Sequence, residues 1–138
     1  MAPVRQRSVA LILARELAEN LLTPMWIWDE DGVLVYLNEP AAAAIVGSSL
    51  DDLGPFRQQD VELFRCEDLD GNPIDVDDLP SAIALREQRP AHRVLRMEGL
   101  DGVKRKITVT AIPLFGRNED FMGVMSLAWA LPEGAPGE

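Results

Sequence analysis

The side chains best suited to chemistry are few and scattered along the 138 residues. There is one histidine, His92, and one cysteine, Cys66, while the serines and carboxylates fall mostly in loop-like segments. A nucleophile needs a base within hydrogen-bond reach, and the residues suggest no such pair. Residues 68–72 have the acidic, glycine-containing pattern of a calcium loop, but Cys66 takes the first ligand position and no glutamate closes the loop. We therefore expect a turn there, and a protein that is not an enzyme.

Charge is the next constraint on what the protein binds. The net charge is −10, which repels a phosphate backbone and argues against nucleic acid as a partner. Residues 60–78 hold eight acidic side chains and one basic one, whereas residues 86–106 hold seven basic side chains and three acidic ones. The acidic stretch is either a solvated loop that aids solubility or a surface that steers a basic protein partner.

Composition also bears on the compartment. No apolar run reaches the roughly 18–20 residues that span a bilayer, and the start lacks the pattern of a secretory signal. A single cysteine excludes an internal disulfide and fits a reducing compartment. We expect Cys66 to be a half-buried thiol in a loop. These features predict a cytoplasmic protein with no membrane partner. The excess of arginine over lysine and the many alanines are typical of a GC-rich bacterial genome.

The elements that must position these residues centre on a hairpin over residues 25–38. Apolar side chains alternate on both sides of an Asp-x-Asp-Gly turn at residues 29–32, which is a strong hairpin signal. Both faces of both arms are apolar, so the hairpin should be covered on two sides.

An amphipathic helix is predicted before the hairpin, over residues 8–22. Ser8 can cap it, apolar residues recur at three- and four-residue steps, and Pro24 ends it. It either docks on its own domain or also pairs with a second copy of the chain.

The rest of the chain alternates short helices with strands. We expect helices at 40–46, 48–53 and 78–88, then strands at 91–97, 105–114 and 121–131. Helices segregated on one face of an antiparallel sheet define an α+β fold.

In its order and spacing of motifs the sequence resembles a PAS domain over roughly residues 20–131. The matching features are the hairpin ending in Asn38, the Asn-Glu-Pro-Ala-Ala run at 38–42, the Asp-Gly-Asn-Pro loop at 70–73, Asp101-Gly102, Pro113-Leu114 and Gly123. The resemblance implies a five-stranded antiparallel sheet that forms a pocket with short helices on one face, the leading amphipathic helix covering the other. The division that follows is a tail and helix at 1–22, the domain at 23–131 and a structureless tail at 132–138.

The resemblance also assigns side chains to the two sheet faces. Those expected toward the helices are Trp26, Trp28, Val33, Val35, Leu37, Leu95, Ile107, Val109, Ala111, Phe121, Met125 and Leu127. Those expected on the outer face are Ile27, Leu34, Tyr36, Ile112, Met122, Val124 and Ala128, a set too apolar to be left in water.

The known cofactors of the family find poor support in the sequence. Flavin-linked photosensors of this kind need a cysteine in a Gly-Arg-Asn-Cys-type helix, and Cys66 lies in Phe-Arg-Cys-Glu-Asp. Haem needs an axial ligand, and alternation places His92 on the outer face. Haem and flavin are therefore not expected, and the cofactor stays unknown. Arg93, on the pocket face, could bind a carboxylate or phosphate or pair with an internal acid.

Two functions remain open, and only the first of them ends in a signal to a partner protein. The favoured one is a stand-alone PAS-type sensor for a small, largely apolar ligand, and the alternative is a ligand-free dimerisation and interaction module. A cavity above ~300 Å³ would favour the first. The expected ligand-binding residues are Trp26, Trp28, Leu37, Ala42, Ile45, Phe56, Phe64, Ile83, Arg93, Leu95, Val109, Met125 and Leu127. The expected interface of a homodimer contains Val9, Ile12, Leu13, Leu17, Tyr36 and Val124.

Overall fold

The computed structural model describes residues 12–14, 23–38 and 55–132 of the chain. Its strands and longest helix are β1 (Met25–Asp29), β2 (Leu34–Leu37), α4 (Pro80–Glu87), β3 (Ala91–Glu98), β4 (Lys104–Phe115) and β5 (Phe121–Ala130). Short 3-10 helices are η1 (Gln58–Phe64), η2 (Val76–Asp78) and η3 (Arg117–Glu119). The helices predicted at 40–46 and 48–53 lie outside the described residues, as does most of the leading helix.

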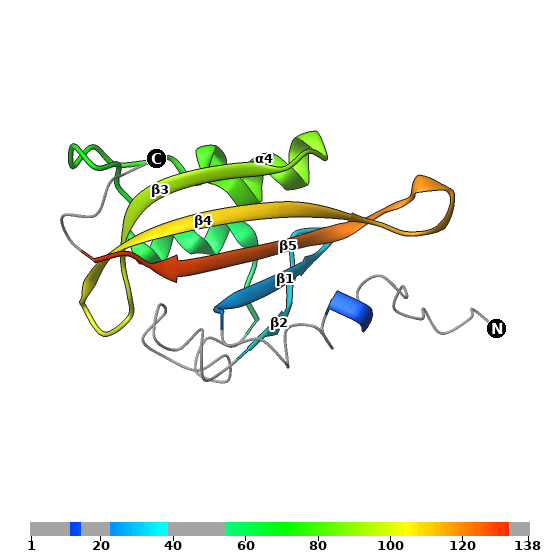
Figure 1. Cartoon of the computed structure of the whole chain (residues 1–138), viewed down its shortest axis with the longest axis horizontal. Helices are drawn as coiled ribbons and strands as arrows, with labels where there is room; N and C mark the ends of the chain where they lie inside the picture. Colours follow the sequence, from blue (N-terminus) through cyan, green and yellow to red (C-terminus); the bar gives the residue numbers. More distant parts are fainter. Residues whose placement is uncertain (1–11, 15–22, 39–54, 133–138) are drawn as a thin grey trace.

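The five strands form one antiparallel sheet in the order β2-β1-β5-β4-β3. The two ends of the domain therefore meet in the middle of the sheet, where β1 pairs with β5. Figure 1 shows the strands side by side, with α4 lying across one face. This is the α+β fold and the five-stranded sheet that the sequence predicts.

Local chemistry explains why β1 and β2 form a hairpin. The Asp29 carboxylate accepts hydrogen bonds from the backbone N–H of Asp31 and of Val33, at 2.9 and 3.0 Å. Gly32 takes a φ of +79°, which a residue with a side chain adopts only at a cost. At the far end, Asn38 accepts from the Met25 N–H at 2.8 Å and donates to the Thr23 carbonyl at 2.7 Å. The Asn38 side chain thus holds the start of β1 in place.

Two irregularities in the sheet shift the alternation of side chains. In β2, Tyr36 is opposite Ile27 and Leu34 is opposite Trp28, so Val35 is an extra residue. In β5, Leu114 of β4 is opposite Gly123 and Phe115 is opposite Phe121, so Met122 is extra. Each bulge moves the residues beyond it to the other face of the sheet.

The bulges overturn part of the predicted face assignment. Five side chains lie in the cluster opposite to the predicted one, and a sixth, Leu127, lies away from the cavity that it was expected to face. Leu34, Val124 and Ala128 belong to the helix-side core, while Val35 and Met125 belong to the outer cluster, and Leu127 is opposite Met25 away from the cavity. The assignments of Trp28, Leu95, Ile107, Ala111, Ile27, Tyr36 and Met122 are confirmed.

Candidate functional site

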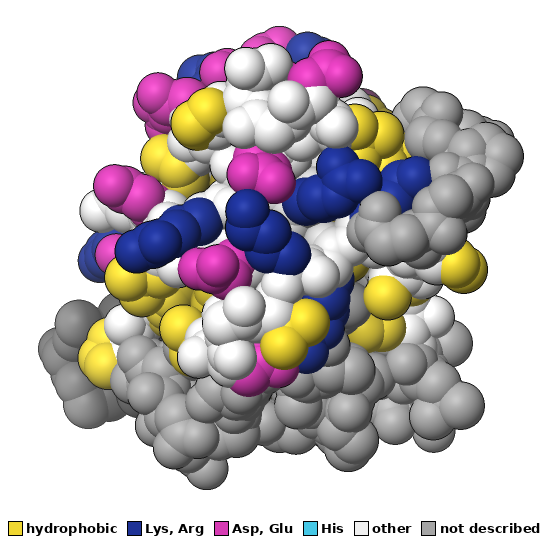
Figure 2. All heavy atoms as spheres, turned by 90° about the vertical axis from the view of Figure 1, so that its left-hand side faces the viewer, with side chains coloured by type: hydrophobic (Ala, Val, Ile, Leu, Met, Phe, Trp, Pro, Cys, Tyr) yellow, Lys and Arg dark blue, Asp and Glu magenta, His cyan; other side chains and the backbone are white. Residues whose placement is uncertain are grey.

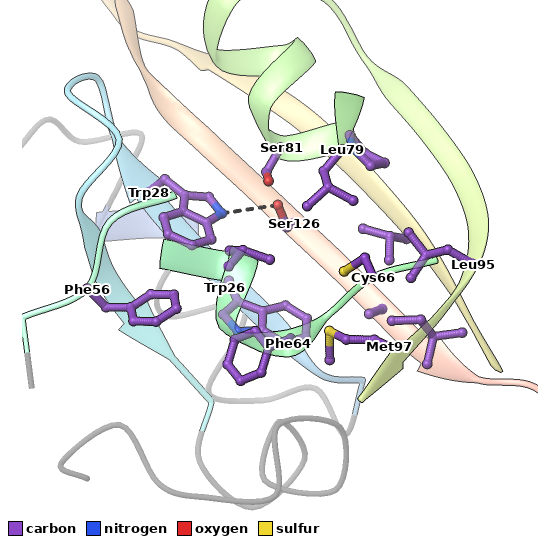
Figure 3. A pocket seen from close by; sticks show the side chains of 15 residues that line it. Trp26, Trp28, Phe56, Phe64, Cys66, Leu79, Ser81, Leu95, Met97 and Ser126 are labelled. Carbon is purple, nitrogen blue, oxygen red and sulfur yellow. Dashed lines mark hydrogen bonds between the residues drawn. The ribbon is translucent and has the colours of Figure 1, made fainter. Parts of the chain in front are cut away.

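The candidate site is an apolar cavity between the sheet and the helical segments. Its volume is about 60 Å³. Its walls come from β1, η1, the start of α4 and the three strands β3, β4 and β5, as Figure 3 shows. The lining residues are Trp26, Trp28, Phe56, Val61, Phe64, Cys66, Leu79, Pro80, Ser81, Leu95, Met97, Ile107, Val109, Ser126 and Ala128.

Three aromatic rings pack in series along one wall of this cavity. The ring centroids of Trp28 and Phe56 are 6.2 Å apart, and those of Phe56 and Phe64 are 5.9 Å apart, both in tilted arrangements. Such tilted pairs are favourable beyond the area that they bury. The aromatic side chains therefore fill much of the space that a ligand would need.

Two serine hydroxyls are among the polar groups that the described residues place at the cavity wall. The Trp28 indole Nε1 donates to Ser126 Oγ at 3.2 Å (Figure 3). Ser81 Oγ accepts from Gln58 Nε2 at 3.3 Å, and the same amide reaches the Val76 carbonyl at 3.3 Å. Both hydroxyls thus already have partners, and the side chains around them offer a ligand chiefly apolar contact.

Cys66 is the one ionisable group among the described residues of the wall. Its side chain is buried, more deeply than the half-buried loop thiol that the sequence predicts. Burial raises the pKa of the Cys66 thiol to about 12, because the apolar surroundings disfavour the thiolate. The neutral thiol behaves as a small apolar wall residue and is a poor nucleophile.

The predicted ligand-binding residues divide into three groups. Trp26, Trp28, Phe56, Phe64, Leu95 and Val109 line the cavity. The predicted residues that do not line the cavity are Leu37, Ile83, Arg93, Met125 and Leu127. Leu37 is buried elsewhere, and the alternation of β5 directs Met125 and Leu127 away from the cavity. Ala42 and Ile45 lie outside the described residues.

Sequence reasoning missed several residues of the wall. Ala128 is expected on the outer face, and alternation puts Ser126 on the same side, but the bulge at Met122 places both at the cavity wall. Leu79 and Pro80 are part of the cavity wall because α4 begins at Pro80. Leu79 precedes the helix in an extended conformation and also lies at the wall. The Leu-Pro pair before an alanine-rich helix was the available signal for both.

The residues predicted at the dimer interface lie in different environments. Ile12 and Leu13 are 45% and 58% exposed, Tyr36 packs with the outer cluster, and Val124 is fully buried in the helix-side core. The assignment of Val124 to an interface is therefore wrong. Val9 and Leu17 lie outside the described residues.

Neither haem nor flavin fits the cavity. His92 lies on the outer face, where its two ring nitrogens contact the hydroxyls of Thr110 and Thr108 at 2.8 and 3.3 Å, so it cannot reach an enclosed haem. Ligand sites generally span about 300–1,000 Å³, several times this volume. In the part of the chain that the structure describes, one acidic group could hold a metal ion: Asp29, Glu30 and Asp31 at the hairpin turn. The Asp29 carboxylate already accepts hydrogen bonds from backbone N–H groups there.

Comparison with solved structures identifies the fold. A PAS domain from Colwellia psychrerythraea has a TM-score of 0.60 and 17% identity, with 88% of this chain and 96% of that chain covered. The PAS domain of BvgS from Bordetella pertussis has a TM-score of 0.61 and 16% identity, covering 91% and 88%. The LOV protein of Rhodobacter sphaeroides has a TM-score of 0.66 and 15% identity, covering 91% and 70%.

The sequence itself gives no such match. No family model matches it, and no curated protein shows significant similarity. The structural likeness nevertheless defines the class: this is a protein of the PAS fold. Within the described residues, no helix is long and apolar enough to cross a membrane.

Proposed function

We propose that the chain is a PAS-type sensory domain that passes its signal to a partner protein through surface contacts and forms a homodimer. The observation that carries this proposal lies on the outer sheet face. Ala14 is buried against Ile27 there, while the adjacent Ile12 and Leu13 remain 45% and 58% exposed. A helical turn held on the sheet by one side and apolar on the other is suited to pairing with a second copy.

The small cavity supports this mode over ligand sensing. About 60 Å³ is well below the ~300 Å³ at which ligand sites begin. A core already filled by Trp28, Phe56 and Phe64 leaves the surface as the route by which the domain acts.

Light scattering on the full chain tests the proposed homodimer. The double variant Ile12→Glu, Leu13→Glu should be monomeric at concentrations where the wild type is a dimer, because charge at a dimer contact is desolvated without a partner. Leu63→Glu is the matched control, since Leu63 is 63% exposed on η1. A monomeric wild type, or a double variant that stays dimeric, would overturn the proposed homodimer.

A second candidate function is binding of a compact apolar ligand in the cavity, with signalling in trans. The observation in its favour is that the described residues of the wall are all uncharged at neutral pH. Native mass spectrometry of the purified protein and tryptophan fluorescence across a panel of small apolar metabolites would detect such a ligand. Ala128→Leu should fill the cavity and abolish the signal, whereas Ala130→Leu on the exposed end of β5 should not. A protein with no bound species and no fluorescence change would exclude this candidate.

A further inference from the structure

The outer edge of β3 carries backbone groups that the described residues leave unused. β3 is an edge strand of the sheet, and it pairs with β4 along only one of its two edges. On the open side, Arg96 exchanges two hydrogen bonds with Glu67, each of 2.9 Å. Because every second residue of a strand directs its N–H and C=O the same way, His92 and Val94 present theirs along this edge. Among the described residues, none forms a backbone hydrogen bond with them there.

The pairing with Glu67 shows that this edge accepts an extended segment. Glu67 belongs to a loop at residues 65–73, which we call the strap, and it meets Arg96 in antiparallel orientation. The strap turns away directly afterwards, because Asp68 accepts hydrogen bonds from the N–H groups of Asp70 and Asn72, both at 2.9 Å. The edge at residues 92–95 is therefore left open by the strap.

Arg93 lies at this open edge and has no direct acidic partner among the residues that the structure describes. It is half-buried, it does not line the cavity, and it forms no hydrogen bond or ion pair with any described residue. The pKa of Asp68 is lowered chiefly by the backbone N–H of Asn72, and the charge of Arg93 contributes least.

Several other basic side chains of the domain have acidic partners. Arg105 binds Asp101 at 2.6 Å, and Lys104 approaches Glu67 at 3.5 Å. Figure 2 shows Lys and Arg interleaved with Asp and Glu on one end of the molecule. A half-buried guanidinium without such a partner is well suited to bind a carboxylate through two parallel hydrogen bonds.

We propose that the β3 edge at residues 92–95 binds an extended segment of the partner protein that carries an acidic side chain beside Arg93. This inference rests on the proposed function and specifies the chemistry of its partner. The segment adds to the sheet beyond β3, its backbone bonds to His92 and Val94, and its carboxylate accepts hydrogen bonds from the Arg93 guanidinium.

Charge argues against a second copy of the chain as the occupant. A two-fold pairing that uses both His92 and Val94 of each copy places Arg93 directly opposite Arg93 of the second copy. Like charges opposite each other across two strands are destabilising. The homodimer contact proposed on the outer face is thus separate from this edge.

Amide exchange measured by NMR on the full chain tests the inference. The probe is an eight-residue peptide, blocked at both ends, that alternates valine and glutamate, and the control peptide has lysine in place of glutamate. The glutamate peptide should slow exchange at His92 and Val94 and bind more tightly than the lysine peptide. Equal binding of the two peptides, or unchanged exchange at both amides, overturns the inference.

Substitution at Arg93 gives a second readout. Arg93→Glu should weaken binding of the glutamate peptide about tenfold or more, as loss of a charge-assisted hydrogen bond implies. Arg117→Glu, an exposed charge in η3, is the matched control and should leave binding unchanged. If Arg93→Glu binds the glutamate peptide as the wild type does, the carboxylate contact is wrong.

The same variants separate this inference from the proposed homodimer. Arg93→Glu should keep the oligomeric state of the wild type in light scattering. The Ile12→Glu, Leu13→Glu variant should bind the glutamate peptide normally even when it is monomeric. Failure of only one of the two assays identifies which of the two surfaces was assigned wrongly.

Discussion

The indole Nε1 of Trp28 and the Oγ of Ser126 lie 3.2 Å apart and join side chains 98 positions apart in the sequence. The bond crosses from β1 to β5, the two strands contributed by opposite ends of the domain, at the wall of the cavity. It satisfies the only polar atom of a tryptophan side chain that is almost fully buried.

Ser126→Ala should therefore destabilise the domain by about 1–3 kcal/mol, because it leaves the buried indole N–H without a partner. Urea denaturation followed by tryptophan emission measures the change. Ser81→Ala is the control, since it removes a hydroxyl from the same cavity without touching the indole. Equal stability of Ser126→Ala and the wild type would show that the bond is energetically neutral.

Gly123→Ala should destabilise the fold by about 3 kcal/mol or more. Gly123 has a φ of +146°, and a Cβ placed there would overlap the carbonyl oxygen of Trp28. Gly71→Ala provides the comparison, since Gly71 also has a positive φ but nothing lies within 4 Å of its missing Cβ. It should cost only about 1–2 kcal/mol in thermal or urea unfolding. Similar losses for both would mean that backbone conformation, not the contact with β1, sets the requirement for glycine.

The buried thiol of Cys66 should make the domain less stable in alkali. Its pKa rises from 9.0 to about 12 on folding, so the unfolded chain loses this proton first as pH increases. The contribution of the protonated Cys66 thiol to the free energy of unfolding is complete below pH 9. It declines toward pH 12 by about 1.4 kcal/mol per pH unit. Urea unfolding between pH 8 and about 11 should show this decline in the wild type relative to Cys66→Ala. Parallel curves for the two proteins would contradict it.

The Asp101 carboxylate should titrate well below its usual range. The side-chain hydrogen bonds from Arg105, followed by the N–H of Val103, lower the pKa of Asp101 to about 2. Its contribution to stability is thus present above pH 3.8 and lost as pH falls through about 2. Carbon NMR of the carboxyl group should give the low midpoint. Arg105→Gln should raise that midpoint, whereas Lys104→Gln should not, because Lys104 approaches Glu67 instead.

Alternation in the sequence predicted the strands well because long strands keep their period. β3, β4 and β5 begin and end within one residue of the expected bounds, and the Asp-x-Asp-Gly hairpin forms as its turn chemistry requires. The order of helices and strands along the chain then predicted an antiparallel sheet and the α+β fold class.

The faces of β2 and β5 were harder to predict because a bulge has no reliable single-sequence signal. One extra residue at Val35 and one at Met122 are enough to exchange the core and surface sides. Gly123 was the available hint, since glycine inside a strand pattern often marks a bulge or a close approach. The same shift explains why Ser126 and Ala128 were missed and why Met125 and Leu127 were wrongly assigned to the cavity.

Cavity volume could not be predicted, because it depends on how large side chains pack. Two tryptophans and two phenylalanines near a pocket can either surround a ligand or fill the space themselves. The ring contacts of Phe56 with Trp28 and Phe64 show the second arrangement. No periodicity in the sequence distinguishes the two.

The central position of β1 and β5 has a consequence during synthesis on the ribosome. β1 cannot complete its pairing until β5, about a hundred residues later, has left the exit tunnel, so the nascent chain holds its tryptophan-rich hairpin without its sheet neighbour for most of translation. During that interval the hairpin exposes a strand edge to which β5 of another molecule could add, producing an exchanged dimer. We therefore expect this connectivity to leave the nascent domain open to strand exchange until β5 emerges.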